Sequence, residues 1–334
     1  MIVVCEKLRK NGYPLRVGVA CDQFQFFWPL HRFSLLTARL TVGTPIYTPH
    51  FVEFNIHSPA SIVFSQKTPV VSRWRNLVIQ TEPYWRMGKT FKFMVEGLEI
   101  FTIASSLEDQ KFQGKLRSQT KKQEMIQEDI EEQASLKDTL DVIMSPLDNV
   151  FSLDKENTSQ KITAEFLRLD LKQEKNNLSG HMTFDDFDAS VFFAPYFVDF
   201  PKIDGNLKWT FNDVPHLFKN GTGPWKWRLY GKSGFLKHSE LTFHSGGGMR
   251  VSGPFSFDDE GYLTAEFKLV VVQHIKFLTI LQRLFPEQTK NLHALFFILG
   301  AMPKSAEGYP VLPLLINHGR VKLGFLKLGR FAPL

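Results

Sequence analysis

Two cysteines, Cys5 and Cys21, are the residues whose type and spacing most clearly predict chemistry in this chain. They flank a turn signal at Gly12-Tyr13-Pro14, and each lies eight residues from Tyr13. A hairpin whose turn is centred on Tyr13 would place the two thiols opposite each other. A disulfide between them would stabilise the fold by about 3 kcal/mol, because it constrains the unfolded chain. The local sequence leaves two free buried thiols equally open. Because disulfides persist in oxidising compartments, the disulfide alternative favours export.

Other fragments do not complete a catalytic or metal-binding motif. The segment 88–90, Gly-Lys-Thr, resembles the end of a phosphate-binding loop, but Pro83 stands where that motif requires its first Gly. The ten histidines are dispersed, and the zinc patterns H-E-x-x-H and C-x-x-C do not occur. Asp185, Asp186 and Asp188 lack the ligand spacing of a calcium loop, and we interpret them as a solvated turn. We therefore predict no catalytic residues, no metal and no cofactor.

The composition is that of an ordinary globular chain with an excess of phenylalanine. Of 334 residues, 43% are hydrophobic, 22% are charged and 32 are Phe. Phe fits the half-buried surface of a pleated sheet, so the excess favours β structure. The net charge of +6 arises from 40 basic and 34 acidic residues that are mixed along the chain. Because nucleic-acid binders concentrate their basic residues in one patch, we predict no nucleic-acid partner.

The sequence contains neither a run long enough to span a bilayer nor a recognisable signal peptide. The longest apolar run, residues 294–302, has nine residues, whereas a membrane-spanning helix requires about 20. The apolar stretch that follows Met1 is shorter than the core of about 7–15 residues in a signal peptide. If Met1 is the true start, these features predict a cytoplasmic protein.

Apolar and polar residues alternate over most of the chain, as in strands that bury one face. In the segment 36–42 the apolar members are Leu36, Ala38, Leu40 and Val42. The same period recurs at 52–56 and 91–95, and Pro or Gly interrupts the pattern about every ten residues. We predict a mainly β fold, an elongated and curved antiparallel sheet of many short strands.

Residues 255–272 form the clearest predicted hairpin. Two Phe residues precede the turn at 258–261, and apolar and polar residues alternate after it. Six apolar residues would share one face of this hairpin: Phe255, Phe257, Leu263, Ala265, Phe267 and Leu269. We predict that this face lines an apolar groove for lipid or acyl chains. The alternative is that two sheets pack against each other into a dry core.

Three helical segments are predicted among the strands. A charged helix near 115–145 has basic residues before acidic ones, which opposes the helix dipole, so we interpret it as a solvated excursion or a partner-docking helix. Two amphipathic helices follow near 273–301, the second of them starting at Pro286. We predict one elongated domain over residues 1–334, with N-terminal strands at 1–104, the excursion at 105–160, and further strands with two helices at 161–334.

Three stretches of the sequence resemble an uncharacterised bacterial family, domain of unknown function family 2125. They are GYPLRVGVACDQF near the start, the hairpin GPFSFDDEGYLTAEFKL, and the closing LPLLINHGRVKLGFLKLG. The family patterns match at Gly12, Tyr13, Pro14, Arg16, Pro313, Leu314, Gly319, Val321, Leu323 and Gly324. The resemblance spans most of the chain and is weakest between about residues 105 and 159.

The resemblance implies a cellular location and a type of fold. Members are found largely in alphaproteobacteria and are typically held in the inner membrane by one N-terminal helix, with the body in the periplasm. This sequence lacks that helix, which implies a truncated or misassigned start at Met1. The hairpin, turn glycines and closing helices are also distantly similar to AsmA-like envelope proteins. Those form long curved sheets with an apolar inner groove, and some of their relatives are implicated in lipid movement. Neither resemblance brings catalytic residues.

The leading hypothesis is therefore a non-enzymatic, membrane-anchored periplasmic protein that takes part in envelope maintenance and has membrane lipids as partners. The alternative from another class is a hydrolase acting on envelope material, with polar residues that converge from distant strands. A nucleic-acid module ranks third and would require a continuous basic face with exposed rings.

Overall fold

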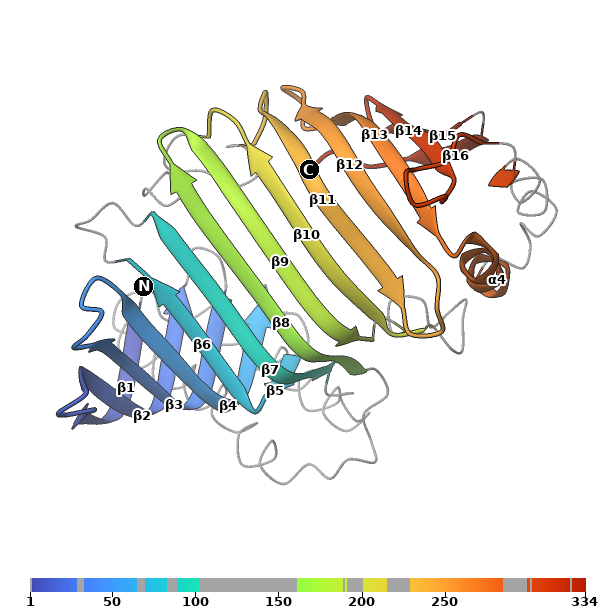
Figure 1. The fold of residues 1–334 in the computed structure, drawn as a ribbon. Helices are drawn as coiled ribbons and strands as arrows, with labels where there is room; N and C mark the ends of the chain where they lie inside the picture. Colours follow the sequence, from blue (N-terminus) through green and yellow to red (C-terminus); the bar gives the residue numbers. More distant parts are fainter. Residues whose placement is uncertain are drawn as a thin grey trace, which may run out of the picture.

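One antiparallel sheet of 16 strands dominates the protein (Figure 1). The computed structural model describes residues 2–28, 33–64, 70–82, 89–102, 161–188, 190, 201–214, 229–284, 299–300, 302–324 and 326–334. Consecutive strands are neighbours in the sheet, as in a meander, with one exception at β5 and β6. The prediction of a mainly β, elongated and curved antiparallel fold is confirmed.

The strands of the first half are β1 (Ile2–Asn11), β2 (Arg16–Trp28), β3 (Phe33–Pro45), β4 (Val52–Phe64), β5 (Val70–Arg73), β6 (Asn76–Thr81) and β7 (Thr90–Thr102). The strands of the second half are β8 (Lys161–Glu174), β9 (Asn177–Phe187), β10 (Ile203–Phe211), β11 (Ser233–Phe243), β12 (Gly248–Phe257), β13 (Leu263–Val272), β14 (Val311–Asn317), β15 (Arg320–Leu323) and β16 (Leu326–Arg330).

Strands β5 and β6 act as one interrupted strand between β4 and β7. Both pair with β4 on one side and with β7 on the other. The interruption falls at Trp74 and Arg75, where the register with β4 shifts by one residue. Trp74 is buried there, and its indole N–H donates to the carbonyl of Ile56 at 2.7 Å. The bulge therefore places a large ring in the core without leaving its polar atom unpaired.

One face of the sheet is apolar across nearly all the strands. Directly paired residues of an antiparallel sheet point to the same side, so the register follows this face from strand to strand. One such row of successive partners runs from β2 to β14: Val19, Val42, Phe54, Ile79, Phe93, Leu169, Met182, Leu207, Ser239, Val251, Leu269 and Leu312. Ser239 is its single polar member. We call the side on which this row lies the inner face.

Register shifts bend the strands and change which residues reach the inner face. A shift between Thr37 and Arg39 separates the two ends of β3. Leu40 and Val42 point inward as predicted, but Thr37 is buried opposite Ala60 on the inner face and Leu36 lies on the other side. The predicted alternation over 36–42 is therefore wrong at its start, because a bulge adds one residue to the period of two.

Helix α4 (His274–Leu284) packs on the inner face at the C-terminal end of the sheet (Figure 1). Its buried residues Phe277, Leu278 and Ile280 form a cluster with strand residues that include Val271 and Leu312. This helix confirms the first amphipathic helix predicted near 273–301. Residues 299–300 are helical, and the rest of the second predicted helix lies outside the described residues, as does the charged helix predicted near 115–145.

The predicted hairpin at 255–272 is confirmed, with β12 and β13 pairing in antiparallel fashion on either side of the predicted turn at 258–261. Phe255 pairs with Ala265 and Phe257 with Leu263 across the β12–β13 turn.

Within the described residues, no helix has the length and apolar character that are required to cross a bilayer.

Candidate functional site

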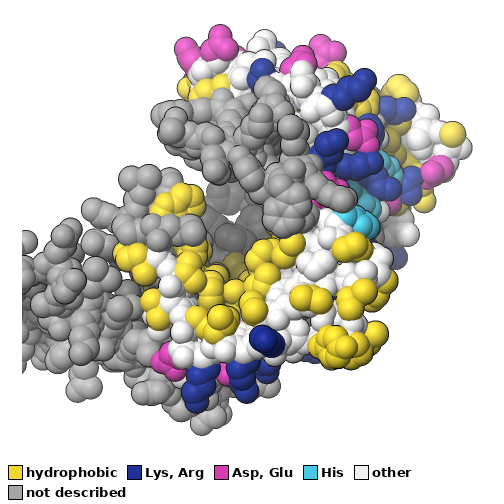
Figure 2. Space-filling model, turned by 90° about the vertical axis from the view of Figure 1, so that its left-hand side faces the viewer, with side chains coloured by type: hydrophobic (Ala, Val, Ile, Leu, Met, Phe, Trp, Pro, Cys, Tyr) yellow, Lys and Arg dark blue, Asp and Glu magenta, His cyan; other side chains and the backbone are white. Residues whose placement is uncertain are grey.

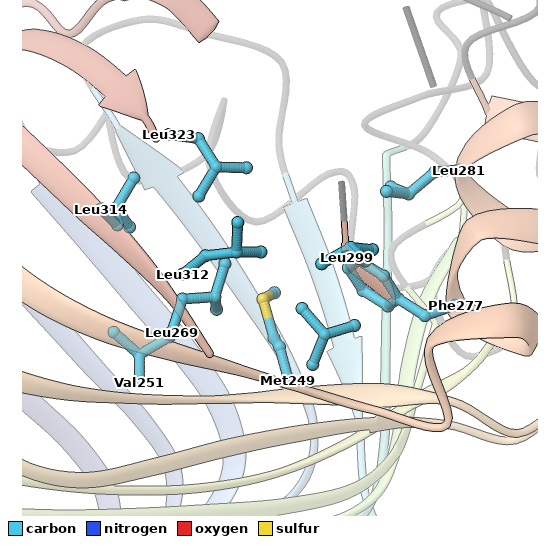
Figure 3. Close-up of a pocket in the computed structure, with 10 residues that line it drawn as sticks. Met249, Val251, Leu269, Phe277, Leu281, Leu299, Leu312, Leu314 and Leu323 are labelled. Atoms are coloured by element: carbon cyan, nitrogen blue, oxygen red, sulfur yellow. The ribbon is translucent and has the colours of Figure 1, made fainter. Parts of the chain in front are cut away.

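An apolar cavity lies between α4 and the inner face of β12 to β15 (Figure 3). Its volume is about 210 Å³. All its lining residues are apolar: Met249, Val251, Leu269, Val271, Phe277, Leu281, Leu299, Leu312, Leu314 and Leu323. An engineered apolar cavity of about 150 Å³ stays dry and binds small apolar molecules. A cavity of this size and lining therefore favours hydrocarbon over water.

The cavity has a fully buried floor and a less buried rim. Val271 and Leu312 are almost fully buried on β13 and β14, and Leu299 is equally buried opposite them. Met249 and Val251, on β12, are only partly buried and pack at the edge of this cluster. Met249 and Val251 therefore mark the less buried side of the cavity.

The six residues predicted as an apolar groove share the inner face, as the register requires. Leu269 lines the cavity itself. Ala265 is buried in a second cluster that also contains Ile316 and Val321, with Phe255, Leu263 and Phe267 packed against it. Phe257 packs against a third cluster around Leu178. The structure thus places the six on one apolar surface but brings only Leu269 to the cavity.

Sequence reasoning missed the residues that close the cavity from other elements. Phe277 and Leu281 come from α4, and Leu314 and Leu323 from the closing hairpin β14–β15. The helical spacing of Leu278 and Leu281 was a usable signal for one buried helix face. The sequence carried no signal that this face would meet β12 and β13.

The inner face is hollowed in the space-filling view (Figure 2). Seen from the side on which β1 to β4 lie in Figure 1, hydrophobic side chains line the hollow, and charged side chains lie mainly on the outer surfaces. At this end the apolar residues are much less covered than at the cavity: Val17 and Val19 of β2 are both exposed.

Cys5 and Cys21 form a disulfide, with Cα atoms 5.7 Å apart. The predicted pair is therefore present, but the turn centre used to predict it is wrong. The turn lies between Asn11 and Arg16, so that Cys5 pairs with Phe24 and Cys21 with Leu8. The disulfide therefore runs diagonally between the two strands of the hairpin. Cys21 and Phe24, the ladder partner of Cys5, flank Gln23 on β2, and Gln23 has a φ of 51°.

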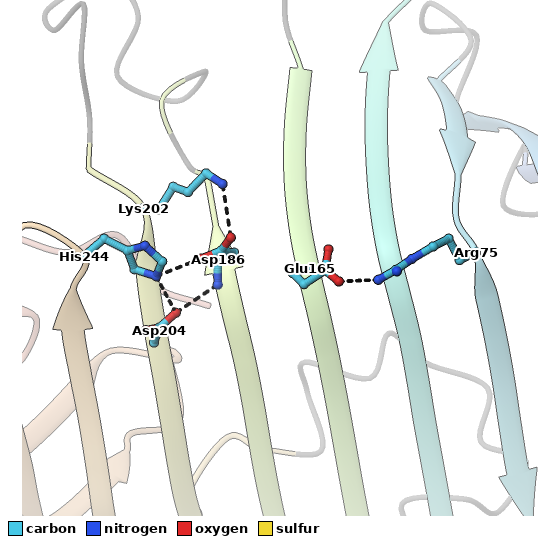
Figure 4. Close-up of polar contacts among 6 residues, drawn as sticks. All are labelled: Arg75, Glu165, Asp186, Lys202, Asp204 and His244. Atoms are coloured by element: carbon cyan, nitrogen blue, oxygen red, sulfur yellow. Dashed lines mark hydrogen bonds and ion pairs between the residues drawn. The ribbon is translucent and has the colours of Figure 1, made fainter.

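A polar cluster on β9 to β11 is the candidate cation site among the described residues (Figure 4). The His244 Nε2 lies 2.8 Å from the Asp186 carboxylate and 3.1 Å from that of Asp204. The ammonium of Lys202 lies 3.2 Å from Asp186, so a cation already pairs with one of these two carboxylates. The side chains are partly exposed, and no second feature points to a metal. Asp186 lies in β9 with a φ of 54°, so the predicted solvated turn is corrected to a strand end.

Other ion pairs lie on the surface of the sheet, away from the cavity. Figure 4 also shows Arg75 paired with Glu165 across β7, and both side chains are exposed. Exposed pairs contribute little to stability, about 0–1 kcal/mol each.

A second histidine–carboxylate pair joins two turns near the C-terminus. The His318 Nδ1 lies 2.8 Å from the Asp258 carboxylate, and the His318 ring packs 4.0 Å from that of Tyr262. Although desolvation opposes it, hydrogen bonds from the backbone N–H of Tyr262 and from His318 lower the pKa of Asp258. Asp258 thereby closes its own turn, and the pair acts as a structural contact between turns.

No histidine or carboxylate of the described residues lines the cavity. The histidine–carboxylate pairs of the described residues, formed by His238, His244 and His318, lie at partly exposed positions on other parts of the sheet. The geometry that would favour a hydrolase, a histidine and a carboxylate converging in a pocket, is therefore not found at this cavity.

A family model described as an uncharacterized protein conserved in bacteria (DUF2125) matches residues 1–145 and 152–332. Searches of curated proteins and of solved structures found no match.

Proposed function

We propose that this chain, which belongs to the uncharacterised bacterial family DUF2125, is a non-enzymatic protein that binds acyl chains of lipids along its inner face. The hydrocarbon would enter the cavity between α4 and β12 to β15 and continue along the apolar row of the sheet. The observation that carries this proposal is the cavity of about 210 Å³ with only apolar lining residues, which shares Val251, Leu269 and Leu312 with a row of twelve strand residues of which only Ser239 is polar.

The physical reason is the free-energy cost of leaving such an apolar surface exposed to water. Burial of apolar surface contributes roughly 25 cal/mol per Å², or about 0.8 kcal/mol for each CH₂ group. An acyl chain presents a continuous series of such groups and is flexible enough to follow a curved sheet. A compact aromatic ligand would use the cavity but not the row.

The test is uptake of a fluorescent fatty acid, added below the concentration at which it aggregates. We expect saturable binding by the purified chain and loss of binding in Val251→Trp, which fills the cavity from its partly buried rim. The matched control is Ile275→Trp, at an exposed position of α4 that is not among the lining residues; it should bind as the wild type does.

Two outcomes would count against the proposal. One is the absence of saturable uptake by a folded wild-type chain that also carries no co-purified lipid in native mass spectrometry. The other is equal uptake by the wild type and a folded Val251→Trp variant, which would move binding away from the cavity.

We propose an envelope location as part of the same function. The support is the Cys5–Cys21 disulfide, because such bonds persist in oxidising compartments. Alkylation of thiols in intact cells tests this: both cysteines should resist the reagent until a reductant is added. Free thiols in cells would contradict the location without affecting the binding test.

A further inference from the structure

The turns at one end of the sheet carry a group of protruding apolar side chains. Tyr13 is 91% exposed, Leu15 70% and Tyr47 73%, and their neighbour Ile46 is also exposed. The two turns touch, because the amide of Ile46 donates to the carbonyl of Leu15 at 3.1 Å. We call Tyr13, Leu15, Ile46 and Tyr47 the apolar tip.

The apolar tip is continuous with the inner face. Leu15 lies in the turn just before β2, Val17 near the start of β2 is also exposed, and Val19 comes next on the same side of the strand. Val19 is the first residue of the apolar row that leads across the sheet, and it pairs with Val42. A hydrocarbon chain leaving the tip would therefore meet apolar side chains along a route in which Ser239 is the single polar member.

Basic residues stand beside the tip. Hairpin β1–β2 carries four basic residues, Lys7, Arg9, Lys10 and Arg16, and two acidic ones, Glu6 and Asp22. Arg9 is paired with Asp22, and Arg16 with Glu53. Lys10 is exposed and pairs with Val19 in the ladder, so its ammonium adds positive charge where the tip joins the inner face.

From these features we infer that the apolar tip docks the protein on an anionic lipid bilayer. Tyr side chains are amphipathic and favour the interface between water and lipid. Lysine adjacent to inserted apolar groups is attracted to acidic headgroups. Side chains that protrude from two turns insert into a fluid surface without the complementary shape that a protein partner requires. The purpose of docking rests on the proposed function, since it would let acyl chains reach the inner face.

The experiment is co-sedimentation of the full chain with vesicles of phosphatidylcholine, with and without phosphatidylglycerol. The tip variant is Leu15→Ser with Ile46→Ser and Tyr47→Ser. We expect its partition onto acidic vesicles to fall by more than about ten-fold, because three apolar groups no longer leave water. The matched control replaces exposed apolar residues elsewhere, Ile275→Ser with Leu315→Ser and Phe331→Ser, and should bind like the wild type.

The charge contribution is tested separately with Lys10→Gln. Its partition onto acidic vesicles should fall by about five-fold, with little change on neutral vesicles. Added salt should weaken the wild type more than this variant.

Fatty-acid uptake distinguishes this inference from the proposed function. The tip variant should still bind a monomeric fluorescent fatty acid, whereas Val251→Trp should lose that binding and keep vesicle binding. Unchanged vesicle binding by the tip variant would overturn the inference, whatever happens to uptake. Self-association of the wild type that the tip variant abolishes, without vesicle binding, would overturn it in favour of a second copy as partner.

Discussion

The two ends of the inner face have the same kind of residues and opposite surroundings. At the C-terminal end α4 lies over β13 and β14, and Val271 is only 1% exposed. At the N-terminal end Val17 of β2 is 67% exposed. The difference teaches that an apolar stripe becomes a core only where another element covers it. Where nothing in the described chain covers it, the same stripe is available to a ligand or a membrane.

The largest expected contrast comes from placing one charge at each end. Val271→Asp would bury a carboxylate without a partner and should destabilise the fold by at least about 4 kcal/mol or prevent folding. Val17→Asp should change the free energy of unfolding by no more than about 0.5 kcal/mol. Urea unfolding followed by tryptophan fluorescence measures both. Similar losses at the two positions would mean that the N-terminal end is covered in solution.

A cavity-creating pair on α4 sharpens the description of the covered end. Phe277 is buried against Phe243 and lines the cavity. Phe277→Ala should cost about 3–5 kcal/mol, because it removes a large buried ring and enlarges the cavity. Ile275→Ala, on the exposed side of the same helix, should stay within about 0.5 kcal/mol of the wild type. An equally small effect of Phe277→Ala in urea unfolding would show that α4 does not close the cavity in solution.

Reduction of the disulfide tests how much this bond stabilises the N-terminal, uncovered end of the inner face, which we call the open end. β1 is the edge strand there, with β2 as its partner, and the disulfide joins them across a separation of 16 residues. Removing this constraint should cost about 3 kcal/mol. Thermal unfolding with and without a reductant measures the loss. A variant with Cys5→Ser and Cys21→Ser should show the same loss and no response to the reductant; a response there would trace the effect to something other than this bond.

The smallest expected effect is a pH dependence at the open end. Glu53 is buried on β4, 2.5 Å from the Arg16 guanidinium. Burial alone would raise its pKa, but hydrogen bonds from Asn55 and Gln80 and the charge of Arg16 lower it below the ordinary value of 4.5. A lowered pKa in the folded state contributes stability that is present above the ordinary value and is lost as the pH falls through the folded value.

We therefore expect the wild type to lose thermal stability below about pH 4.5, and Glu53→Gln to lose less over the same range. Scanning calorimetry from neutral to acidic pH measures both proteins. Glu266→Gln, an exposed site on β13, is the control. If it flattened the profile as much as Glu53→Gln, the assignment to Glu53 would be wrong.

Bulges limit how far the strand pattern could be read from the sequence. The hairpin at 255–272 was predictable, because apolar and polar residues alternate without interruption from Leu263 to Leu269 and its turn is rich in turn-forming residues. The start of β3 was not, because the shift between Thr37 and Arg39 leaves no compositional mark. The turn centre of the first hairpin failed for a related reason. Several turn types fit Gly12-Tyr13-Pro14, and pairing along the whole strands selects one.

The sequence by itself determined that the chain forms strands with one apolar side and that a helix follows β13; it left open whether the two cysteines bond, and the structure decided that they do. These features depend on local period and short separations, which neighbouring residues fix. Only the tertiary structure decided that α4 and the β14–β15 hairpin meet β12 and β13 around a cavity. It alone also decided that the apolar tip and the start of β2 stay exposed. Contacts between distant segments depend on the summed bend of many strands, and no single stretch of sequence encodes that sum.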